Sequence, residues 1–385
     1  MGRYAQKRLH IFGEDIMSLT LTNYWWLLIW LFIGGPMLNG MPKRRELLGD
    51  RVVERWDMFP AVMLVVPFIL WAGFRSDSFG DTGAYRISFL NAEASVGAAL
   101  RILASDSKDV GYYALQSVVK IIIGNRDKLF FTMVAAFQML SVVQIYRKFT
   151  PHYWLCIFLF VASTDYLSWM HNGLRQFTAV TMILAALPWV IEKRYASMIA
   201  LILLASTIHG SAILMIPIIF IIQGEAWNAK TLLLLCATGL VVVFVDRFSP
   251  ILNNLLQDTQ YDNMMTNEIW TQDDGANIIR VLVYSVPALF SLAGLRYARS
   301  ANDPVINICV NCSIVTMALY LVAAVSSGIY IGRLPIYTTL QGYMVLPWLI
   351  ERMFERRSAS LITIIMVLMF CAFFYFQMHF TWGYL

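Results

Sequence analysis

Residues 165–176, DYLSWMHNGLRQ, place an acid, an imidazole, a guanidinium and a carboxamide between two apolar runs that are each long enough to span a membrane. Asn172-Gly173 interrupts the apolar periodicity and Asn is a good helix N-cap, so we expect Arg175 in the first turn of the next helix. A cation there opposes the helix dipole, at a cost of about 0.3–1 kcal/mol. A phosphate shared between the guanidinium and the free N–H groups would offset that cost. The alternatives are that Arg175 pairs with Asp165 or reaches lipid headgroups.

The composition identifies the class of protein. The 385 residues are 59% hydrophobic and only 14% charged, with a mean hydropathy of +0.63, which indicates a polytopic membrane protein. The net charge of +5 is therefore no sign of nucleic-acid binding. Cys309 and Cys312 are spaced like half a zinc site, but no second pair or histidine follows, so we expect no metal and no cofactor.

We expect an all-α fold, a single polytopic domain over residues 1–385 with about 11–12 transmembrane or half-spanning helices. The polar tail, residues 1–21, lacks the features of a signal peptide, and either Met1 or Met17 could be the start. The run from 195 to 223 is too long for one helix and is expected to be a broken pair hinged at His209-Gly210. The other spans are expected at about 22–40, 57–74, 129–146, 152–169, 173–191, 231–245, 278–295, 305–326, 335–350 and 361–376.

Basic residues set the expected orientation. About fifteen of the 29 Lys and Arg fall in short loops on one side, which predicts that those loops are cytoplasmic. Residues 75–128 then form a long outer loop, and residues 246–277 form a second one. Within the first, residues 91–104 and 112–123 show helical spacing and are expected to be amphipathic helices on the outer membrane surface.

The few ionisable groups at the expected outer ends of spans are the candidate site. His209 is the only ionisable residue in its long apolar run, and Asp77, Asp81 and Tyr85, spaced by four, would share one face if their segment is helical. Charges collected at one face, without an internal repeat, favour surface chemistry on an anionic substrate over transport. The four outer arginines are Arg75, Arg175, Arg280 and Arg333.

Several segments, in this order, resemble the EpsG family of bacterial exopolysaccharide and O-antigen polymerases, which is related to Wzy. They are FRSDSFGDTGAY, KDVGYY, NGLRQFTA, TIHGSA and a late arginine before LP, and the similarity covers about residues 56–350. The family commonly has Asp-Tyr where this chain has Asp81-Thr82, and an acid-Pro-Gly where it has Asp109-Val110-Gly111.

The resemblance implies a glycosyltransferase-C-like polymerase in the bacterial cytoplasmic membrane that acts on undecaprenyl-pyrophosphate-linked oligosaccharides at the outer face. Membrane lipid and a chain-length regulator protein are further implied partners. The pyrophosphate would lie where Arg175, Arg333 and either Arg75 or Arg280 converge. His209 would be the general base, with Asp77 or Asp81 as the rival. The remaining expected substrate-binding residues are Gln176, Tyr85, Asp165 and Asn172.

Each assignment has a structural alternative. His209 could cap a broken helix, and Arg280 could pair with Asp273 or Asp274. Asp77 and Asp81 could pair with Arg75 and Arg86 or bind sugar hydroxyls. Tyr85, Tyr166 and Trp169 could stack on sugars, although aromatic residues are expected at a membrane interface in any case. A ligase with another acceptor would share the chemistry, whereas a lipid-linked oligosaccharide flippase would need arginines within spans on the cytoplasmic side.

Overall fold

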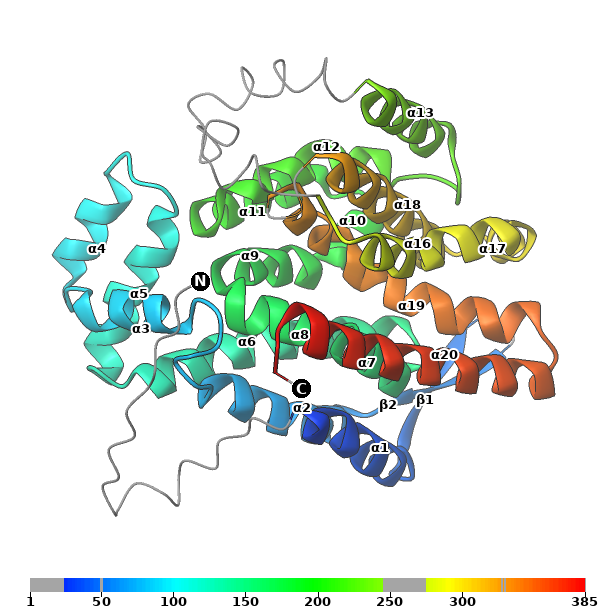
Figure 1. Ribbon diagram of the computed structural model, residues 1–385, viewed down its shortest axis with the longest axis horizontal. Coiled ribbons are helices and arrows are strands. Elements are labelled where there is room, and N and C mark those ends of the chain that lie inside the picture. Colours follow the sequence, from blue (N-terminus) through cyan, green and yellow to red (C-terminus); the bar gives the residue numbers. More distant parts are fainter. Residues whose placement is uncertain (1–23, 49–50, 245–274, 327, 329, 385) are drawn as a thin grey trace.

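The computed structural model describes residues 24–48, 51–244, 275–326, 328 and 330–384 (Figure 1). The N-terminal tail, most of the second expected outer loop, and Asp273 and Asp274 lie outside these residues. The first half of the chain contains α1 (Trp25–Asn39), β1 (Lys43–Leu48), β2 (Arg51–Trp56), α2 (Met58–Gly73), α3 (Thr82–Asn91), α4 (Val96–Leu103), α5 (Val110–Ile123), α6 (Asp127–Phe149), α7 (Tyr153–Ala162), α8 (Asp165–Leu167), the π-helix η1 (Ser168–Asn172), α9 (Leu174–Ala185) and α10 (Leu187–Ile191). The second half contains α11 (Tyr195–Ile208), the 3₁₀ helix η2 (Gly210–Leu214), α12 (Met215–Ile221), α13 (Ala229–Val243), α16 (Ile278–Ala293), α17 (Leu295–Ala301), α18 (Pro304–Val325), η3 (Ile331–Arg333), α19 (Ile336–Met353), α20 (Arg356–Phe376) and η4 (Gln377–Thr381).

The described chain is all-α apart from one hairpin, which confirms the predicted fold class. Three of its helices are long and apolar enough to cross a membrane: α6, α18, and α20 continued by η4. Two pairs, α7 with α8–η1 and α16 with α17, qualify together but bend by 70° at a break. Seven further apolar helices have only 10–17 residues, fewer than the roughly 20 of a full span. The protein is a multi-pass membrane protein in which many of the expected spans are short or broken.

Helix α19 corresponds to the span expected at about 335–350, but it is not among the helices that are apolar enough to cross a membrane. It carries Thr338, Thr339 and Gln341 in its first half, and all three are buried. Thr338 and Thr316 of α18 join their hydroxyls at 2.8 Å, while Thr339 donates to the Pro335 carbonyl. Both threonine hydroxyls are therefore hydrogen-bonded within the protein, as expected for a central helix that other helices shield from lipid.

The segment after α1 forms an antiparallel hairpin, where a basic loop was expected. Strands β1 and β2 pair from Lys43 opposite Trp56 to Leu48 opposite Arg51. Cross-strand ion pairs join Arg45 to Glu54 at 3.1 Å and Arg55 to Glu46 at 3.0 Å. The strand was not predicted because the charged sequence KRRELL lacks the alternation of apolar and polar residues that marks a half-buried strand.

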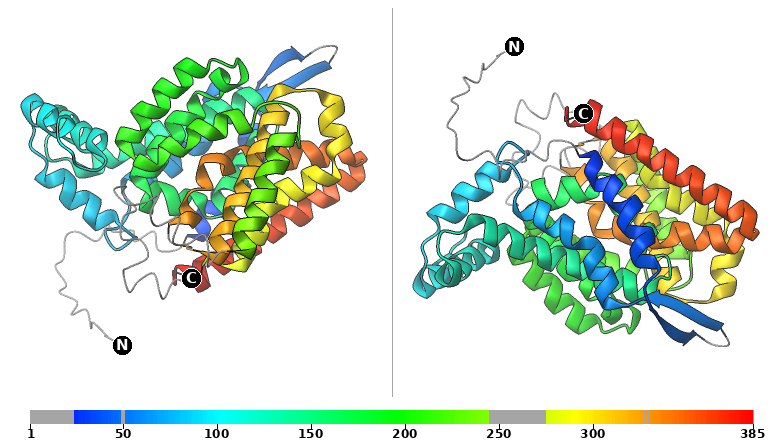
Figure 2. Two further views of the ribbon diagram at one scale, coloured as in Figure 1. Left: turned by 90° about the horizontal axis from the view of Figure 1, so that it is seen from above. Right: turned by 90° about the horizontal axis from the view of Figure 1, so that it is seen from below.

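The long loop after α2 contains three helices, α3, α4 and α5, which protrude from the bundle (Figure 2). Helices were expected at residues 91–104 and 112–123, and the structure confirms helices there as α4 and α5. Helix α3 was not expected, since Gly80 and Gly83 weaken the helical pattern. In both views of Figure 2 these helices lie at the opposite end of the molecule from the β1–β2 hairpin.

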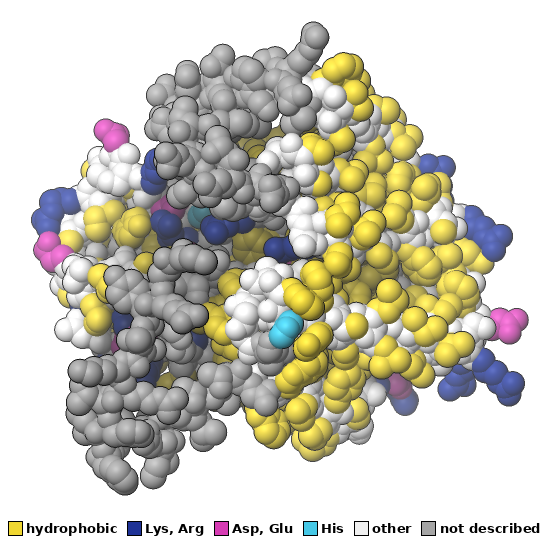
Figure 3. All heavy atoms as spheres, viewed as in Figure 1, with side chains coloured by type: hydrophobic (Ala, Val, Ile, Leu, Met, Phe, Trp, Pro, Cys, Tyr) yellow, Lys and Arg dark blue, Asp and Glu magenta, His cyan; other side chains and the backbone are white. Residues whose placement is uncertain are grey.

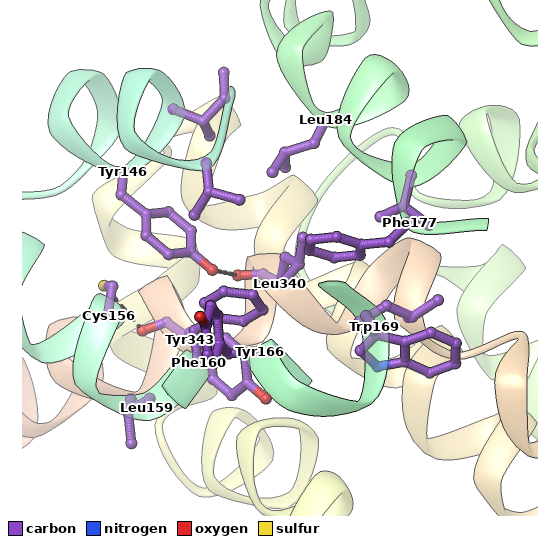
Figure 4. Packing of buried hydrophobic residues seen from close by; sticks show 14 of the residues in the cluster. Tyr146, Cys156, Leu159, Phe160, Tyr166, Trp169, Phe177, Leu184, Leu340 and Tyr343 are labelled. Carbon is purple, nitrogen blue, oxygen red and sulfur yellow. Dashed lines mark hydrogen bonds between the residues drawn. The ribbon is translucent and has the colours of Figure 1, made fainter. Parts of the chain in front are cut away.

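The core lies where α6, α7, α9 and α19 meet (Figure 4). Tyr146 donates its hydroxyl to the Leu340 carbonyl at 2.8 Å, and the Cys156 thiol donates to the Tyr343 carbonyl at 3.2 Å. Such bonds fix the approach of α6 and α7 to α19 in a medium without water. All five cysteines are free thiols; Cys156, Cys309 and Cys312 are buried, whereas Cys236 is exposed.

The surface in the view of Figure 1 is divided by chemistry. Hydrophobic side chains cover much of this face, most continuously on its right half, while Lys and Arg lie at the right-hand end and over the left half as far as the middle (Figure 3). Exposed apolar residues on α20 include Leu361, Ile364, Leu368 and Met369. This pattern is typical of a protein whose long axis runs across a bilayer.

Candidate active site

Two helix breaks form the frame of the site. The first is the turn of α8 and η1 before α9, and the second is the interruption at His209 between α11 and η2. Helix α9 begins at Leu174, so Arg175 lies in its first turn, as predicted. The expected N-cap is wrong: Gly173 is the N-cap residue, and no side chain caps the helix. Asn172 instead accepts a hydrogen bond from the backbone N–H of Asp81 at 3.0 Å, which ties the turn to the segment before α3.

Arg175 is held by a carboxylate and two aromatic rings. Its Nη1 donates to Asp109 Oδ2 at 2.7 Å and to the Tyr113 hydroxyl at 3.2 Å. Its guanidinium carbon lies 5.9 Å from the Tyr85 ring centre and 5.8 Å from that of Tyr113, within range of cation–π attraction. The side chain remains 30% exposed. The expected alternative partner, Asp165, does not pair with it; Asp109 takes that place.

Asp109 connects both breaks. It has a left-handed backbone (φ 57°) directly before α5, and its side chain is only 5% exposed. Oδ2 binds Arg175, while Oδ1 accepts from the Gly210 N–H at 3.2 Å, one residue after His209. Gly111 allows the close approach of α5 to α11, since a Cβ there would collide with the Thr207 hydroxyl. No role was predicted for Asp109, although it belongs to the Asp109-Val110-Gly111 motif.

His209 lies outside the helices, in the break at the end of α11. Its Nδ1 is 2.7 Å from the Ser211 hydroxyl, which is in turn 3.0 Å from the Tyr337 hydroxyl on α19. The predicted break at His209-Gly210 is confirmed. Burial, followed by the positive charges of Arg175 and Arg333, lowers the pKa of His209 to about 4. The imidazole is therefore neutral at neutral pH and has a lone pair to accept a proton.

Arg333 is exposed at the end of η3, two residues before Pro335, the N-cap residue of α19. Its backbone carbonyl accepts a hydrogen bond from Gln176 Nε2 at 2.9 Å. Gln176 is buried in α9 beside Arg175. This bond fixes the loop before α19 against the first turn of α9, so Arg175, His209 and Arg333 belong to one neighbourhood.

The two candidate aspartates differ in their surroundings. Helix α3 begins at Thr82, so the expected shared helix face does not include Asp77. Asp77 instead pairs with Arg86, which also binds Asp127 Oδ2 at 2.6 Å. Asp81 is exposed just before α3, and within the described residues its carboxylate makes no hydrogen bond or ion pair. Tyr85, one turn further along, donates to the Asn172 carbonyl at 3.1 Å.

Arg75 lies apart from Arg175, inside the protein. It is 5% exposed, donates to Thr82 Oγ1 at 3.1 Å and to the Met170 carbonyl at 2.8 Å, and stacks over Phe131. Its contacts join α2, α3 and η1. This placement favours a structural role for Arg75 over the predicted contact with pyrophosphate.

Asp165 forms the centre of a second, buried cluster. The hydroxyls of Tyr284 and Tyr343 each donate to its carboxylate at 2.6 Å, and the Trp169 indole donates at 3.1 Å. Arg280 lies over the Tyr284 ring at 5.7 Å. The Asp165 side chain is thus fully engaged by α16 and α19, and at 1% exposure it is unavailable to a surface substrate.

Tyr166 and Trp169 are also buried, at 0% and 4% exposure. Neither the sugar-stacking nor the membrane-interface interpretation fits these two rings, because both lie in the core (Figure 4). Tyr166 donates its hydroxyl to the Phe68 carbonyl at 2.7 Å and packs edge-on against His171. Both ring nitrogens of His171 are buried without a hydrogen-bond partner among the described residues.

Comparison with known families decides where the chain belongs. Residues 58–383 match the model of the EpsG family. The chain belongs to the EpsG family. No curated protein and no solved structure matches it.

The four candidate arginines of this EpsG-family protein, expected at the outer ends of spans, therefore separate into two groups. Arg175 and Arg333 accompany His209 at the helix breaks, whereas Arg75 and Arg280 are occupied in the buried networks around η1 and Asp165. The described residues contain no group of three or more His, Cys, Asp or Glu side chains that could hold a metal ion. The chemistry available at the breaks is that of a neutral imidazole beside two guanidinium groups.

Proposed function

We propose that this protein is a membrane-embedded glycosyltransferase of exopolysaccharide biosynthesis. In this proposal it is a Wzy-type polymerase that transfers an undecaprenyl-pyrophosphate-linked glycan chain onto a lipid-linked repeat unit at the outer face of the bacterial cytoplasmic membrane. Membership of the EpsG family supports the polymerase-like activity. The observation that carries the chemistry is the neutral His209 imidazole beside the Arg175 guanidinium in the first turn of α9.

The donor's pyrophosphate is the leaving group of this reaction. Arg175 binds Asp109 and Tyr113 through Nη1, and its side chain remains 30% exposed, so guanidinium N–H groups can face a ligand. Those N–H groups and the exposed Arg333 side chain are suited to the oxygens of a pyrophosphate. As the anomeric C–O bond breaks, both cations stabilise the negative charge that develops on the departing undecaprenyl pyrophosphate.

His209 takes the role of the general base. Ser211 occupies Nδ1, which leaves Nε2 for the acceptor hydroxyl. The acceptor oxygen attacks the anomeric carbon, its proton passes to Nε2, and the pyrophosphate leaves with the electron pair of the broken bond. The pair of Asp77 with Arg86 makes Asp77 a weaker rival, since its carboxylate is already engaged by a guanidinium. Asp81, which is exposed and whose carboxylate has no partner among the described residues, is the stronger rival.

The glycosyltransferase-C-like arrangement is part of the same proposal. Its support is the combination of short broken helices with a chemical site at one end of the bundle. A ligase remains the second candidate, because the same residues would serve a different acceptor. A flippase is the third candidate and is less favoured, because the ionisable groups described above gather at the helix breaks and in closed networks instead of lining a passage.

The test uses the full-length protein in proteoliposomes supplied with a fluorescent undecaprenyl-pyrophosphate-linked repeat unit. We expect a ladder of lengthening products and release of undecaprenyl pyrophosphate from wild type. Transfer of the label to an unrelated acceptor without a ladder would identify a ligase. Movement of label across the bilayer with no new glycosidic bond would overturn the enzymatic proposal.

A further inference from the structure

The end of the molecule opposite the candidate active site contains a groove between α1, α7 and α20. Its volume is about 400 Å³, within the range of small-molecule sites. Trp56, Trp154 and Leu155 line it together with Pro36 and Thr363. The Trp154 indole donates to the Leu31 carbonyl at 2.8 Å, so this wall is fixed. The groove is therefore a built, mostly apolar site at the ends of membrane helices.

A second hollow of about 420 Å³ adjoins the groove and has the opposite chemistry. Lys43, Arg45 and Glu54 of the β1–β2 hairpin line it, and Asn39 lines both hollows. Lys43 pairs in register with Trp56. Residues directly opposite each other, and alternate residues of one strand, project from the same face of a hairpin. One face of the hairpin therefore presents Trp56 to the groove and two cations beside it.

The charges at this face favour an anion. Arg45 is 75% exposed and forms an ion pair with Glu54, whereas Lys43 has no carboxylate partner within the described residues. Strands β1 and β2 carry five basic and two acidic residues, a net charge of +3. The basic residues are Lys43, Arg44, Arg45, Arg51 and Arg55, and the acidic residues are Glu46 and Glu54. A cationic hollow continuous with an apolar groove matches a molecule with an anionic head and a hydrocarbon tail.

We propose that the two hollows form one binding site for an anionic glycerophospholipid. An acyl chain occupies the groove between Trp56, Trp154 and Thr363, and the headgroup phosphate binds Lys43 and Arg45. Tryptophan at the level of the headgroups and basic residues beside it are the features by which proteins hold such lipids. The hairpin lies at the other end of the molecule from α3, α4 and α5 (Figure 2), and Arg175 binds Asp109 at the start of α5. The lipid site is therefore independent of the proposed polymerase reaction.

The headgroup arm of the test is native mass spectrometry of the full-length protein in detergent with dioleoyl phosphatidylglycerol or dioleoyl phosphatidylcholine. Wild type should bind phosphatidylglycerol at least tenfold more tightly than the Lys43→Gln/Arg45→Gln variant, because each cation near the headgroup favours anionic lipid. The matched control is Lys193→Gln/Arg194→Gln, in the exposed basic turn before α11. It should bind as wild type does.

The second part of the test blocks the groove in which the acyl chain is proposed to bind. Thr363→Phe places a ring in the groove from α20, where the Thr363 hydroxyl bonds only its own helix at Ala359. Bound phosphatidylglycerol should fall about tenfold or more. Ile364→Phe, one residue along at a position that is 57% exposed, should have no effect.

Three outcomes would overturn the proposal: equal binding of the two lipids by wild type, unchanged binding after Lys43→Gln/Arg45→Gln, or equal effects of Thr363→Phe and Ile364→Phe. None of these measurements depends on glycosyltransferase activity. A protein that binds the lipid but makes no polymer would contradict the proposed function alone.

Discussion

Asp109 divides its carboxylate between two elements, accepting from Arg175 through Oδ2 at 2.7 Å and from the N–H after His209 through Oδ1 at 3.2 Å. We predict that Asp109→Asn lowers the polymerisation rate by about ten- to a hundredfold, since small displacements of reacting groups have effects of that size. The amide can still accept from Gly210 but no longer pairs with Arg175. Steady-state kinetics in proteoliposomes measure the loss.

The control for Asp109 is Asp106→Asn, at an exposed position of the same loop. It should leave the rate unchanged. Equal rates for Asp109→Asn and wild type would show that the ion pair has no part in positioning.

Arg175→Lys should lose most of the activity although it keeps the charge. A planar guanidinium can bind Asp109 and pyrophosphate oxygens at the same time, whereas an ammonium group offers a single point of contact. The readout is polymer length and rate on lipid-linked repeat units. Arg101→Lys on α4, where the arginine pairs with Glu93 at 2.8 Å on the surface, is the matched control. Near-normal polymer from Arg175→Lys would return Arg175 to the role of a headgroup anchor.

His209→Ala should fold, bind the lipid-linked unit and fail to extend it. Removal of a general base typically lowers the rate by about 10²–10⁴-fold with little effect on binding. Asp77→Asn and Asp81→Asn, assayed in parallel, test the rival bases. If His209→Ala polymerises at the wild-type rate while Asp81→Asn is inactive, the base is Asp81 and His209 is a structural cap.

The pH dependence follows from the charges around His209. Because its pKa is lowered to about 4, the imidazole stays deprotonated and active as a base down to about pH 5, and the rate should fall only as the pH approaches 4. Arg333→Gln removes one of the charges that lower this pKa, so the fall should move to higher pH. Arg296→Gln on α17, at the other end of the bundle, should leave the profile in place. If the pH–rate profile of Arg333→Gln is the same as that of wild type, the Arg333 charge does not act on His209.

Orientation is testable with single cysteines in a cysteine-free chain. Arg44→Cys in the hairpin and Asp106→Cys in the outer loop lie in segments at opposite ends of the molecule (Figure 2). An impermeant thiol reagent should label position 106 from outside intact cells and position 44 only after the membrane is opened. The reverse pattern would place Arg175 and His209 at the cytoplasmic face.

Local sequence signals predicted the parts of the site that depend on local structure. Asn172-Gly173 marked the turn before α9, and the polar interruption at His209 marked the break after α11. The partners could not be predicted in this way. Asp109 is 66 residues from Arg175 and 101 from Gly210, and helical periodicity carries no information at those separations. The same limit explains Asp165, which was expected to bind substrate and instead binds tyrosines of two later helices.

The carboxylate of Asp165 also bears on the order in which the protein assembles. Tyr284 and Tyr343 follow it by 119 and 178 residues, so both are synthesised long after the turn that they complete. Until α16 and α19 have entered the bilayer, the carboxylate has the neighbouring Trp169 as its one described side-chain donor. A charge left in such surroundings is costly. Closure of this turn is therefore a late event of biogenesis, and a chain that stops before α19 retains an uncompensated acid that membrane quality control can detect.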